Sequence, residues 1–298
     1  MTFTLSDQAR SAGYRLAAFD TIGSTSPEAL ARAKAGDSGP LWIVSAHQSA
    51  GQGRHGSAWH TPKGNLAASL LLTTDLPTAT LATLGFVAGV ALAQALDRVC
   101  VLRDKPLSAP QRHAGRGSDD VRHREEARRS VLNQPPPIRF SLKWPNDVLV
   151  DGAKLAGILL GTEELESGRR AVVIGIGVNV ATAPRELPYP VTSLQTLGCA
   201  TEADRVFEAL SGTWLEVERL WDHGRGFATI RELWLERAAG LGGAVAVQTG
   251  TAAKCGTFET IDEQGQLVIR SGDGATHRVS AGEVHFGAAA SATPEARV

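Results

Sequence analysis

The chain has 298 residues, of which 43% are hydrophobic and 20% charged, and its formal net charge is −1. This length and composition suit a folded protein of one large domain or two unequal domains. A near-neutral chain lacks the basic excess that neutralises nucleic-acid phosphates, so we expect no nucleic-acid partner. No uninterrupted apolar run approaches the roughly 20 residues that span a bilayer, and the first residues lack the pattern of a signal peptide. We therefore expect a cytoplasmic protein with no membrane partner.

The three cysteines, Cys100, Cys199 and Cys255, are far apart and lie outside any Cys-x-x-Cys spacing. An odd number in this arrangement favours neither a disulfide framework nor a zinc site, so we expect buried free thiols. The eight histidines are equally scattered and include no His-x-x-x-His pair. The histidine pattern therefore indicates no metal site.

The first 50 residues predict a strand, a helix and a second strand. The first strand covers residues 16–20. Ser26 has the side chain of an N-cap and is followed by a proline, which favours a helix over residues 27–35. Gly36 can adopt the left-handed conformation that ends a helix, and residues 41–47 are typical of the next strand.

A glycine-rich stretch, Gly51-Gln52-Gly53-Arg54-His55-Gly56-Ser57, follows this second strand. It is too polar and too rich in glycine for regular structure, so we expect a loop that leads to a strand over residues 65–72. Apolar residues then recur at steps of three and four over residues 78–100, which predicts a helix packed against the sheet.

Residues 103–137 interrupt this pattern. They contain eight lysines and arginines against five acidic residues, and they end in three prolines. A basic arm that binds nucleic acid is one interpretation, but the charges are mixed and no aromatic side chain lies between them. A charged, disordered insertion is the better prediction.

The second half of the chain predicts a contiguous antiparallel group of strands, then two helices over the same sheet, then a small separate β-barrel with a frayed tail after residue 287. The strands of the first group cover residues 138–144, 148–151, 155–163 and 171–180. The helices cover residues 206–221 and 228–238, and the barrel strands cover 244–249, 254–261, 266–270 and 276–280.

Three polar features flank the predicted strands, and the packing of a hydrophobic core does not explain them. The glycine loop offers backbone N–H groups and Arg54 to an anion such as phosphate or carboxylate, although most such loops are ordinary connections. Lys154 precedes an apolar strand, where it is either a functional cation or a strand-end lysine with its charge in water. Asn146 and Asp147 follow a proline and could be simple turn residues. No single feature decides the function.

Taken together, these features resemble the biotin protein ligase family in order and spacing. The resemblance covers most of residues 16–287, and the run Lys-Trp-Pro-Asn-Asp with Lys-Leu-Ala-Gly-Ile is highly specific to that family. The matching places are Ser24-Thr25, Gln48 with Gly51-x-Gly53-Arg54-x-Gly56, Lys143-Trp144-Pro145-Asn146-Asp147, Lys154-Leu155-Ala156-Gly157-Ile158 and Gly175-x-Gly177-x-Asn179.

The resemblance implies an α+β fold with a mixed, largely antiparallel sheet covered by helices, of the class II synthetase-like type, followed by a small SH3-like barrel. We expect a catalytic domain over residues 1–240, the barrel over 241–287 and a flexible tail over 288–298. The implied activity is that of an ATP-dependent ligase. It joins biotin to ATP as biotinyl-5′-AMP and transfers biotin to a lysine of a biotin carboxyl carrier protein or domain.

The resemblance also assigns roles to individual residues. Lys154 and Arg54 are the expected catalytic residues, because the biotin carboxylate and the ATP α-phosphate repel each other and need positive charge between them. The expected biotin-binding residues are Ser24, Thr25, Ser26, Gln48, Gln52, Gly53, Arg54 and Lys154. The expected ATP-binding residues are Gly51, Gly53, Arg54, Trp59, Asn146, Lys154 and Asn179.

Magnesium is expected on the ATP phosphates, held mostly by phosphate and water, with Asn146 or Asp147 as candidate ligands. The glycine loop departs from the most basic family version, because Gln52 and Ser57 stand where many relatives carry arginine. We therefore expect adenylate retention to depend strongly on Arg54 and Lys154.

Three alternatives stay beside this interpretation. A lipoate or octanoyl ligase shares the catalytic fold, but the Lys-Trp-Pro-Asn-Asp run favours biotin. A biotin-sensing repressor needs an N-terminal DNA-binding domain, and only about 15 residues precede the first predicted strand. An inactive biotin-binding module is the third. Parts of the family form a homodimer through a sheet edge, and the sequence identifies no interface.

Overall fold

The computed structural model describes residues 2–101, 138–184, 187–249 and 252–286. Two predicted segments, the insertion over 103–137 and the tail over 288–298, lie outside the described residues. The described chain forms two sheets, one of seven strands and one of five.

The seven-stranded sheet has the order β1-β2-β3-β7-β6-β5-β4. Strand β1 pairs parallel with β2, and every other neighbouring pair is antiparallel. The prediction of a largely antiparallel sheet is therefore confirmed. The strands are β1 (Arg15–Phe19), β2 (Leu41–Ser45), β3 (Leu66–Thr74), β4 (Ser141–Lys143), β5 (Asp147–Val150), β6 (Ala153–Glu164) and β7 (Arg170–Val178).

Helices cover both faces of this sheet, which explains why all five residues of β2 are buried. Successive side chains of a strand point to opposite faces. Trp42 and Val44 accordingly join the larger hydrophobic cluster, whereas Leu41 and Ile43 pack with α2 (Thr25–Lys34) in a second cluster.

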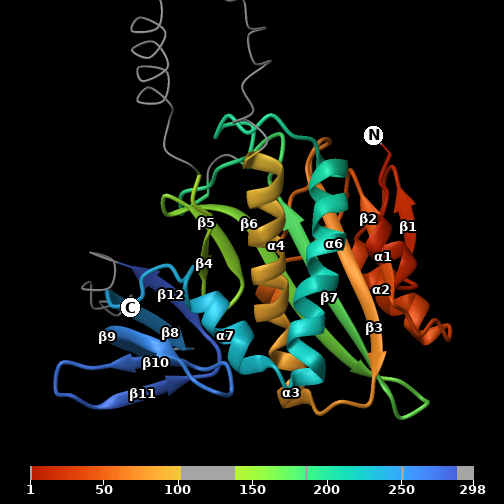
Figure 1. Ribbon diagram of the computed structural model, residues 1–298. Helices are drawn as coiled ribbons and strands as arrows, with labels where there is room; N and C mark the ends of the chain where they lie inside the picture. Colours follow the sequence, from red (N-terminus) through yellow and green to blue (C-terminus); the bar gives the residue numbers. More distant parts are fainter. Residues whose placement is uncertain (1, 102–137, 185–186, 250–251, 287–298) are drawn as a thin grey trace, which may run out of the picture.

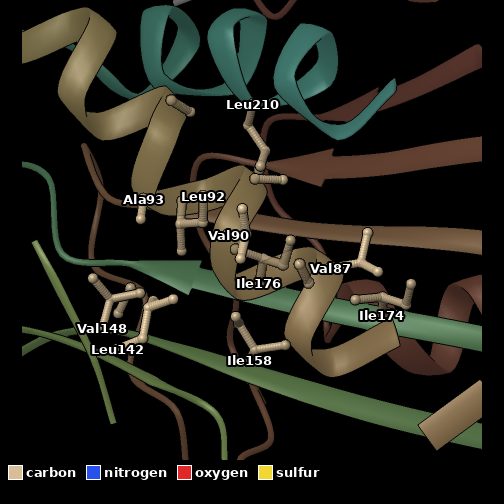
Figure 2. Packing of buried hydrophobic residues seen from close by; sticks show 14 of the residues in the cluster. Val87, Val90, Leu92, Ala93, Leu142, Val148, Ile158, Ile174, Ile176 and Leu210 are labelled. Carbon is tan, nitrogen blue, oxygen red and sulfur yellow. The ribbon is translucent and has the colours of Figure 1, made fainter. Parts of the chain in front are cut away.

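The larger cluster lies between the sheet and two long helices, α4 (Leu84–Val101) and α6 (Ala203–Trp221). The two helices lie side by side across one face of the sheet (Figure 1). Figure 2 shows Val87 and Val90 of α4 packed with Ile174 and Ile176 of β7. Helix α7 (Phe227–Leu235) packs against α4 and α6 on the same side. The opposite face, near α2, is left for the site.

The helix predicted over 78–100 is divided into α3 (Thr78–Ala82) and α4, with Thr83 between them. The stretch Thr78–Cys100 is long and apolar enough to span a membrane, so the expectation that no segment reaches that length is wrong. Its most apolar window is 72% buried inside the protein. This stretch is apolar because it packs between the sheet and α6.

The start of α2 also differs from the prediction. The N-cap is Ser24, and the helix begins at Thr25, so the prediction of Ser26 as N-cap is wrong. The hydroxyl of Ser26 instead contacts the hydroxyl of Ser69 in the sheet. Gly36 has a φ of +97° and follows the helix in the left-handed conformation that the sequence predicts. A short helix, α1 (Asp7–Ser11), precedes β1 and has no counterpart in the prediction.

The five-stranded sheet has the order β11-β10-β9-β8-β12 and is antiparallel throughout. Its last strand, β12, was not predicted, because the partner that defines it, β8, lies more than 30 residues earlier in the chain. The strands are β8 (Ala244–Thr249), β9 (Ala252–Ile261), β10 (Leu267–Arg270), β11 (Thr276–Val279) and β12 (Glu283–Phe286).

The two sheets share one hydrophobic cluster, because Val245 and Phe258 of the second sheet belong to the same cluster as Phe86 and Phe227. The indole Nε1 of Trp144 adds a polar link by donating to the carbonyl of Gly265 at 3.1 Å. The second sheet is therefore packed against the first and contributes residues to the same surface.

The cysteines differ from the prediction of buried free thiols. Cys100 and Cys199 form a disulfide with a Cα–Cα distance of 5.4 Å, and Cys255 is a free, exposed thiol. The disulfide joins the end of α4 to the segment before α6, across a sequence separation of 99 residues. Spacing in the sequence cannot reveal this pair, since the packing of α4 brings the two residues together.

Candidate active site

A cavity of about 740 Å³ opens on the sheet face that carries α2, and it also touches β12 of the second sheet. A pocket of this size suits a ligand as large as a nucleotide conjugate. The structure brings most of the predicted site residues to its wall. These are Ser24, Thr25, Ser26, Gln48, Gln52, Gly53, Arg54, Trp59, Asn146, Asp147 and Lys154.

Two glycines of β7 form part of the cavity floor. A Cβ at Gly175 would lie 2.7 Å from the hydroxyl of Ser26, and one at Gly177 would lie 2.3 Å from the indole of Trp59. Both glycines face away from the core because Ile174 and Ile176 occupy the alternate positions. Gly175 and Gly177 are two residues apart on one strand, so their positions are about 7 Å apart. Ser26 and Trp59, which lie against them, therefore mark two separate places in the cavity.

The part of the cavity near Gly175 is uncharged and its side chains bond to one another; we call it the neutral part, formed by the lining residues Thr25, Ser26 and Gln48 and by Thr61 and Ser69 behind them. Gln48 Oε1 accepts from the backbone N–H of Thr25 at 2.8 Å and from its hydroxyl at 3.1 Å. Gln48 Nε2 donates to Thr61 Oγ1 at 3.1 Å. Ser69 donates to Thr25 Oγ1 at 2.8 Å and contacts Ser26 Oγ at 2.9 Å. These bonds hold the side chains in one arrangement.

The glycine loop is an ordered structure, although it was predicted as an irregular connection. Gly53 N–H donates to the carbonyl of Ser57 at 2.7 Å, and Trp59 N–H donates to the carbonyl of Gly51 at 2.9 Å. Residues Arg54–Gly56 form a single 3₁₀ turn. A Cβ at Gly51 would lie 2.3 Å from the carbonyl oxygen of Trp59, so this close approach of two backbones requires glycine.

The part of the cavity near Gly177 carries charge; we call it the charged part, formed by Arg54, Lys143, Asn146, Asp147 and Lys154. Arg54 donates to Asn146 Oδ1 and to the carbonyl of Gly282, each at 3.2 Å. Asn146 is itself held by a 2.6 Å hydrogen bond from Nδ2 to the carbonyl of Ile158. Arg54 therefore joins the glycine loop to both sheets.

Lys154 lies at the centre of the charged part. Its Nζ is 2.8 Å from Asp147 Oδ1, and the two side chains are only 20% and 16% exposed. This distance is that of an ion pair, but Asp147 Oδ1 has no hydrogen bond of acceptable geometry. The contact is therefore an electrostatic attraction between the ammonium and the carboxylate. The ammonium also lies 5.6 Å from the ring centre of Trp59 and 5.8 Å from that of Tyr189, within cation–π range. Lys154 is therefore a cation of the cavity wall, with only 20% of its side chain exposed to solvent.

Lys143 is a second lysine of the cavity wall, and its Nζ lies 5.7 Å from the ring centre of Phe286 in β12. Burial lowers the pKa of its ammonium below the ordinary value of 10.5, and the carboxylates of Asp147 and Glu283 oppose this shift. In the sequence, Lys143 stands out only as the first residue of the run Lys143-Trp144-Pro145-Asn146-Asp147. No local signal distinguishes it, because its environment depends on β12.

Other lining or supporting residues were also not anticipated. Tyr189 is 44% exposed at the cavity rim, and Ser69 and Thr61 of the neutral part are buried behind its lining residues. Two predicted residues, Gly51 and Asn179, are buried next to the cavity and are not among its lining residues. Asn179 Nδ2 donates to the carbonyl of Thr192 at 3.1 Å, so it orders the segment that pairs with Lys154.

Within the described residues, no group of three or more histidine, cysteine or acidic side chains could hold a metal ion. The acidic side chains that line the cavity are Asp147 and Glu283. These two carboxylates are the negatively charged groups that the cavity wall offers to a cation.

The sequence was compared with known proteins. The Biotin/lipoate A/B protein ligase family matches residues 30–179, and the Biotin protein ligase C terminal domain matches residues 240–287. The second match covers all five strands of the second sheet. Together the matches span strands on both sides of the cavity.

Two relatives are similar over nearly their whole length. A biotin--[acetyl-CoA-carboxylase] ligase of Paracoccus denitrificans is 36% identical over 270 residues, which are 89% of this chain and 97% of the relative. A protein of the same name from Mycobacterium tuberculosis is 32% identical and covers 94% of this chain and 93% of its own. Among solved structures, a biotin protein ligase from Aquifex aeolicus in complex with biotin and ATP superposes with a TM-score of 0.67 at 21% identity, covering 92% of this chain and 99% of that one. At this identity the superposition concerns the fold alone.

Proposed function

The chain belongs to the biotin protein ligase family, and from this premise we propose how its cavity performs the family's reaction. The protein is an ATP-dependent ligase that activates biotin as biotinyl-5′-AMP and transfers it to a lysine of a biotin carboxyl carrier domain. The observation that carries the proposal is one cavity with an uncharged, hydrogen-bonded part beside a part containing three cations.

The neutral part suits the fused ring of biotin. Its cyclic urea has N–H donors and a carbonyl acceptor, and hydroxyl and amide side chains offer matching partners. With the ring beside Gly175, the pentanoate chain extends along β7 toward Gly177. This direction brings the carboxylate to Lys154, because Gly177 pairs with Gly157 and a Cβ at Gly157 would lie 3.5 Å from the Lys154 side chain.

In the first step, a carboxylate oxygen of biotin forms a bond to the α-phosphorus of ATP. The bond from that phosphorus to the bridging oxygen breaks, and its electron pair leaves with pyrophosphate. Lys154 lies between the two anions and offsets their repulsion while negative charge moves across the phosphorus. Asp147 keeps the ammonium directed into the cavity before the substrates bind.

Arg54 and the backbone N–H groups of the glycine loop close over the adenylate in this proposal. Arg54 now bonds to two neutral groups, Asn146 and the carbonyl of Gly282. A phosphate is a stronger acceptor because it is charged, so it can replace these partners at the guanidinium. Closure excludes water from a mixed anhydride that water would otherwise hydrolyse.

The indole of Trp59 lies beside Gly157 and Gly177 and can offer a face to adenine. Gln52 and Gly53 belong to the glycine loop and contribute to its closure over the adenylate. Asn179 contributes to the nucleotide site by ordering the segment after β7, because its own amide is already bonded to Thr192. Lys143 supplies the third cation for the triphosphate.

Magnesium bound to the ATP phosphates would supply charge neutralisation on the leaving pyrophosphate. The residues fit such an ion only in part, since the Asp147 carboxylate lines the cavity but its Oδ1 is already paired with the Lys154 ammonium at 2.8 Å. This suits a cation held mainly by phosphate oxygens and water, with Asp147 as a single protein ligand or close neighbour.

In the second step, the neutral amine of the acceptor lysine attacks the acyl carbon of the adenylate, AMP leaves, and the amine loses a proton. The proposed partner is the biotin carrier domain of a carboxylase, reached in the cytoplasm. Residues 241–287 act as a small C-terminal domain whose strand β12 completes the cavity.

The test is incubation of the protein with biotin, Mg-ATP and a biotin carrier domain, followed by mass measurement of the carrier. We expect the mass of one biotinyl group on one lysine and none when ATP or biotin is omitted. A carrier of unchanged mass, with a positive control ligase modifying the same sample, would contradict the proposal.

A further inference from the structure

The hydrogen bonds of the neutral part form one continuous chain through five side chains. Starting from the cavity, the chain runs from Ser26 to Ser69, Thr25, Gln48 and Thr61, with steps of 2.8 to 3.1 Å. Ser69, Thr61 and Thr25 are almost completely buried, and Gln48 is 8% exposed. Because these side chains are buried, each hydroxyl or amide hydrogen of the hydrogen-bond chain has few acceptors within reach.

The direction of this chain follows from groups that can act in only one way. The backbone N–H of Thr25 can only donate, and it points to Gln48 at 2.8 Å, which identifies that atom as the carbonyl Oε1. A carbonyl oxygen can only accept, so the Thr25 hydroxyl donates to it. The amide Nε2 then faces Thr61 as a donor.

The same logic passes back to the cavity. Since the Thr25 hydrogen is used on Gln48, Ser69 must be the donor in its contact with Thr25. A hydroxyl has one hydrogen, so in the contact between Ser26 and Ser69 the donor is Ser26. The Ser26 oxygen is left with lone pairs and no hydrogen for the cavity.

Ser26 can present these lone pairs to a ligand. Its side chain is half-buried, lines the cavity and lies so close to Gly175 that a Cβ there would come within 2.7 Å of the Ser26 oxygen. A ligand at this place meets a hydrogen-bond acceptor whose direction was set before binding. An N–H group satisfies it, whereas a ring atom without hydrogen to donate leaves it unpaired.

We propose that Ser69, which lies behind the cavity wall, is a specificity-determining residue that makes Ser26 an acceptor and thereby selects a ligand ring bearing N–H groups. This inference rests on the proposed function and deepens it. A cyclic urea meets the requirement, and the dithiolane ring of lipoic acid, which carries an acid chain of the same length, does not. The requirement matters because the family that matches this chain includes ligases for biotin and for lipoate. Leaving one buried polar group unpaired is the kind of penalty that separates such ligands.

The test is calorimetric titration of four proteins, the unsubstituted chain, Ser69→Ala, Ser26→Ala and the double variant, with biotin and with lipoic acid. We expect Ser69→Ala to weaken biotin binding about 5-fold and Ser26→Ala about 10-fold, the size of one hydrogen bond, with lipoic acid binding unchanged. If Ser69 acts through Ser26, the double variant binds biotin as Ser26→Ala does.

Ser211→Ala is the matched control, because Ser211 is an equally buried serine in α6 outside the cavity. We expect it to bind biotin normally. Unchanged biotin affinity in Ser69→Ala, losses that multiply in the double variant, or an equal loss for lipoic acid would each overturn the proposal. If the unsubstituted chain itself fails to bind biotin, both the proposed function and this inference fail. If the unsubstituted chain binds biotin and only the variants lose affinity, the proposed function stands.

Discussion

In the neutral part of the cavity, five side chains from α2, β3 and the segments after β2 bond to one another, whereas in the charged part the cations bond to groups that a substrate can replace. Gln48 is bonded at both atoms of its amide. Arg54, by contrast, contacts two neutral oxygens at 3.2 Å, and Lys154 contacts one carboxylate.

This difference indicates two ways of preparing a site. An uncharged network can be complete before the ligand arrives, because its remaining donors and acceptors are few and already directed. Buried cations cannot stay unpaired, since an isolated charge away from water is costly. They therefore need temporary partners, and substrate binding exchanges those partners. Substitutions in the charged part should change the reaction, and substitutions in the neutral part should change affinity.

The largest effect is expected for Lys154→Ala. Loss of the cation between two reacting anions should reduce biotin-dependent pyrophosphate exchange on the order of 10²- to 10³-fold, with a smaller change in biotin affinity. Lys34→Ala, at an exposed ion pair with Glu163, is the matched control and should exchange normally. Near-normal exchange by Lys154→Ala would contradict the central role of this lysine.

The next effect is expected for Arg54→Ala. Removal of hydrogen bonds to a charged phosphate should speed the release of biotinyl-5′-AMP about 10- to 100-fold, while the adenylate still forms. A single-turnover reaction with rapid filtration measures release directly. Arg205→Ala, at an exposed pair with Glu208, should release as the unsubstituted protein does, and unchanged release by Arg54→Ala would show that closure does not depend on this residue.

A smaller effect is expected for Lys143→Met, which keeps the length of the side chain without its charge. The KM for ATP should rise about 10-fold and the KM for biotin should not change. Because burial lowers the pKa of Lys143, its charge is present at low pH and is lost as pH rises through a value below 10.5. The unsubstituted protein should therefore lose ATP affinity in that alkaline range, and Lys143→Met should lack this step.

The titration is measured as the KM for ATP against pH, with exposed Lys63→Met as the control. An unaltered KM in Lys143→Met, or the same alkaline step in that variant, would exclude Lys143 from the ATP site.

The smallest effect is expected for Thr61→Val, which removes the acceptor for Gln48 Nε2 in the neutral part. Biotin should bind about 3-fold more weakly, since one neutral hydrogen bond is lost, and kcat should not change. Thr229→Val, an exposed position in α7, is the control. A kcat effect as large as that of Lys154→Ala would break the distinction between the two parts of the cavity.

Local features of the sequence determined much of the site. Gly175 and Gly177 stand at alternate positions of a predicted strand and therefore share one face, and the motif residues Arg54, Asn146 and Lys154 do converge on one cavity. Most strands and helices were predicted, because their periodicity is a property of adjacent residues, whereas α1 and β12 were not.

Contacts between distant segments were decided only by the tertiary structure. Ser69 is a polar residue in an apolar strand, and its hydroxyl finds its partner, Thr25, only because α2 packs over that strand. Lys143 is a cavity residue because β12 folds back beside it, and Cys100 meets Cys199 because α4 ends beside the segment before α6. Residue type and local spacing set which groups a chain can offer, but the partners of a buried polar group are chosen by packing, which the sequence near that group does not record.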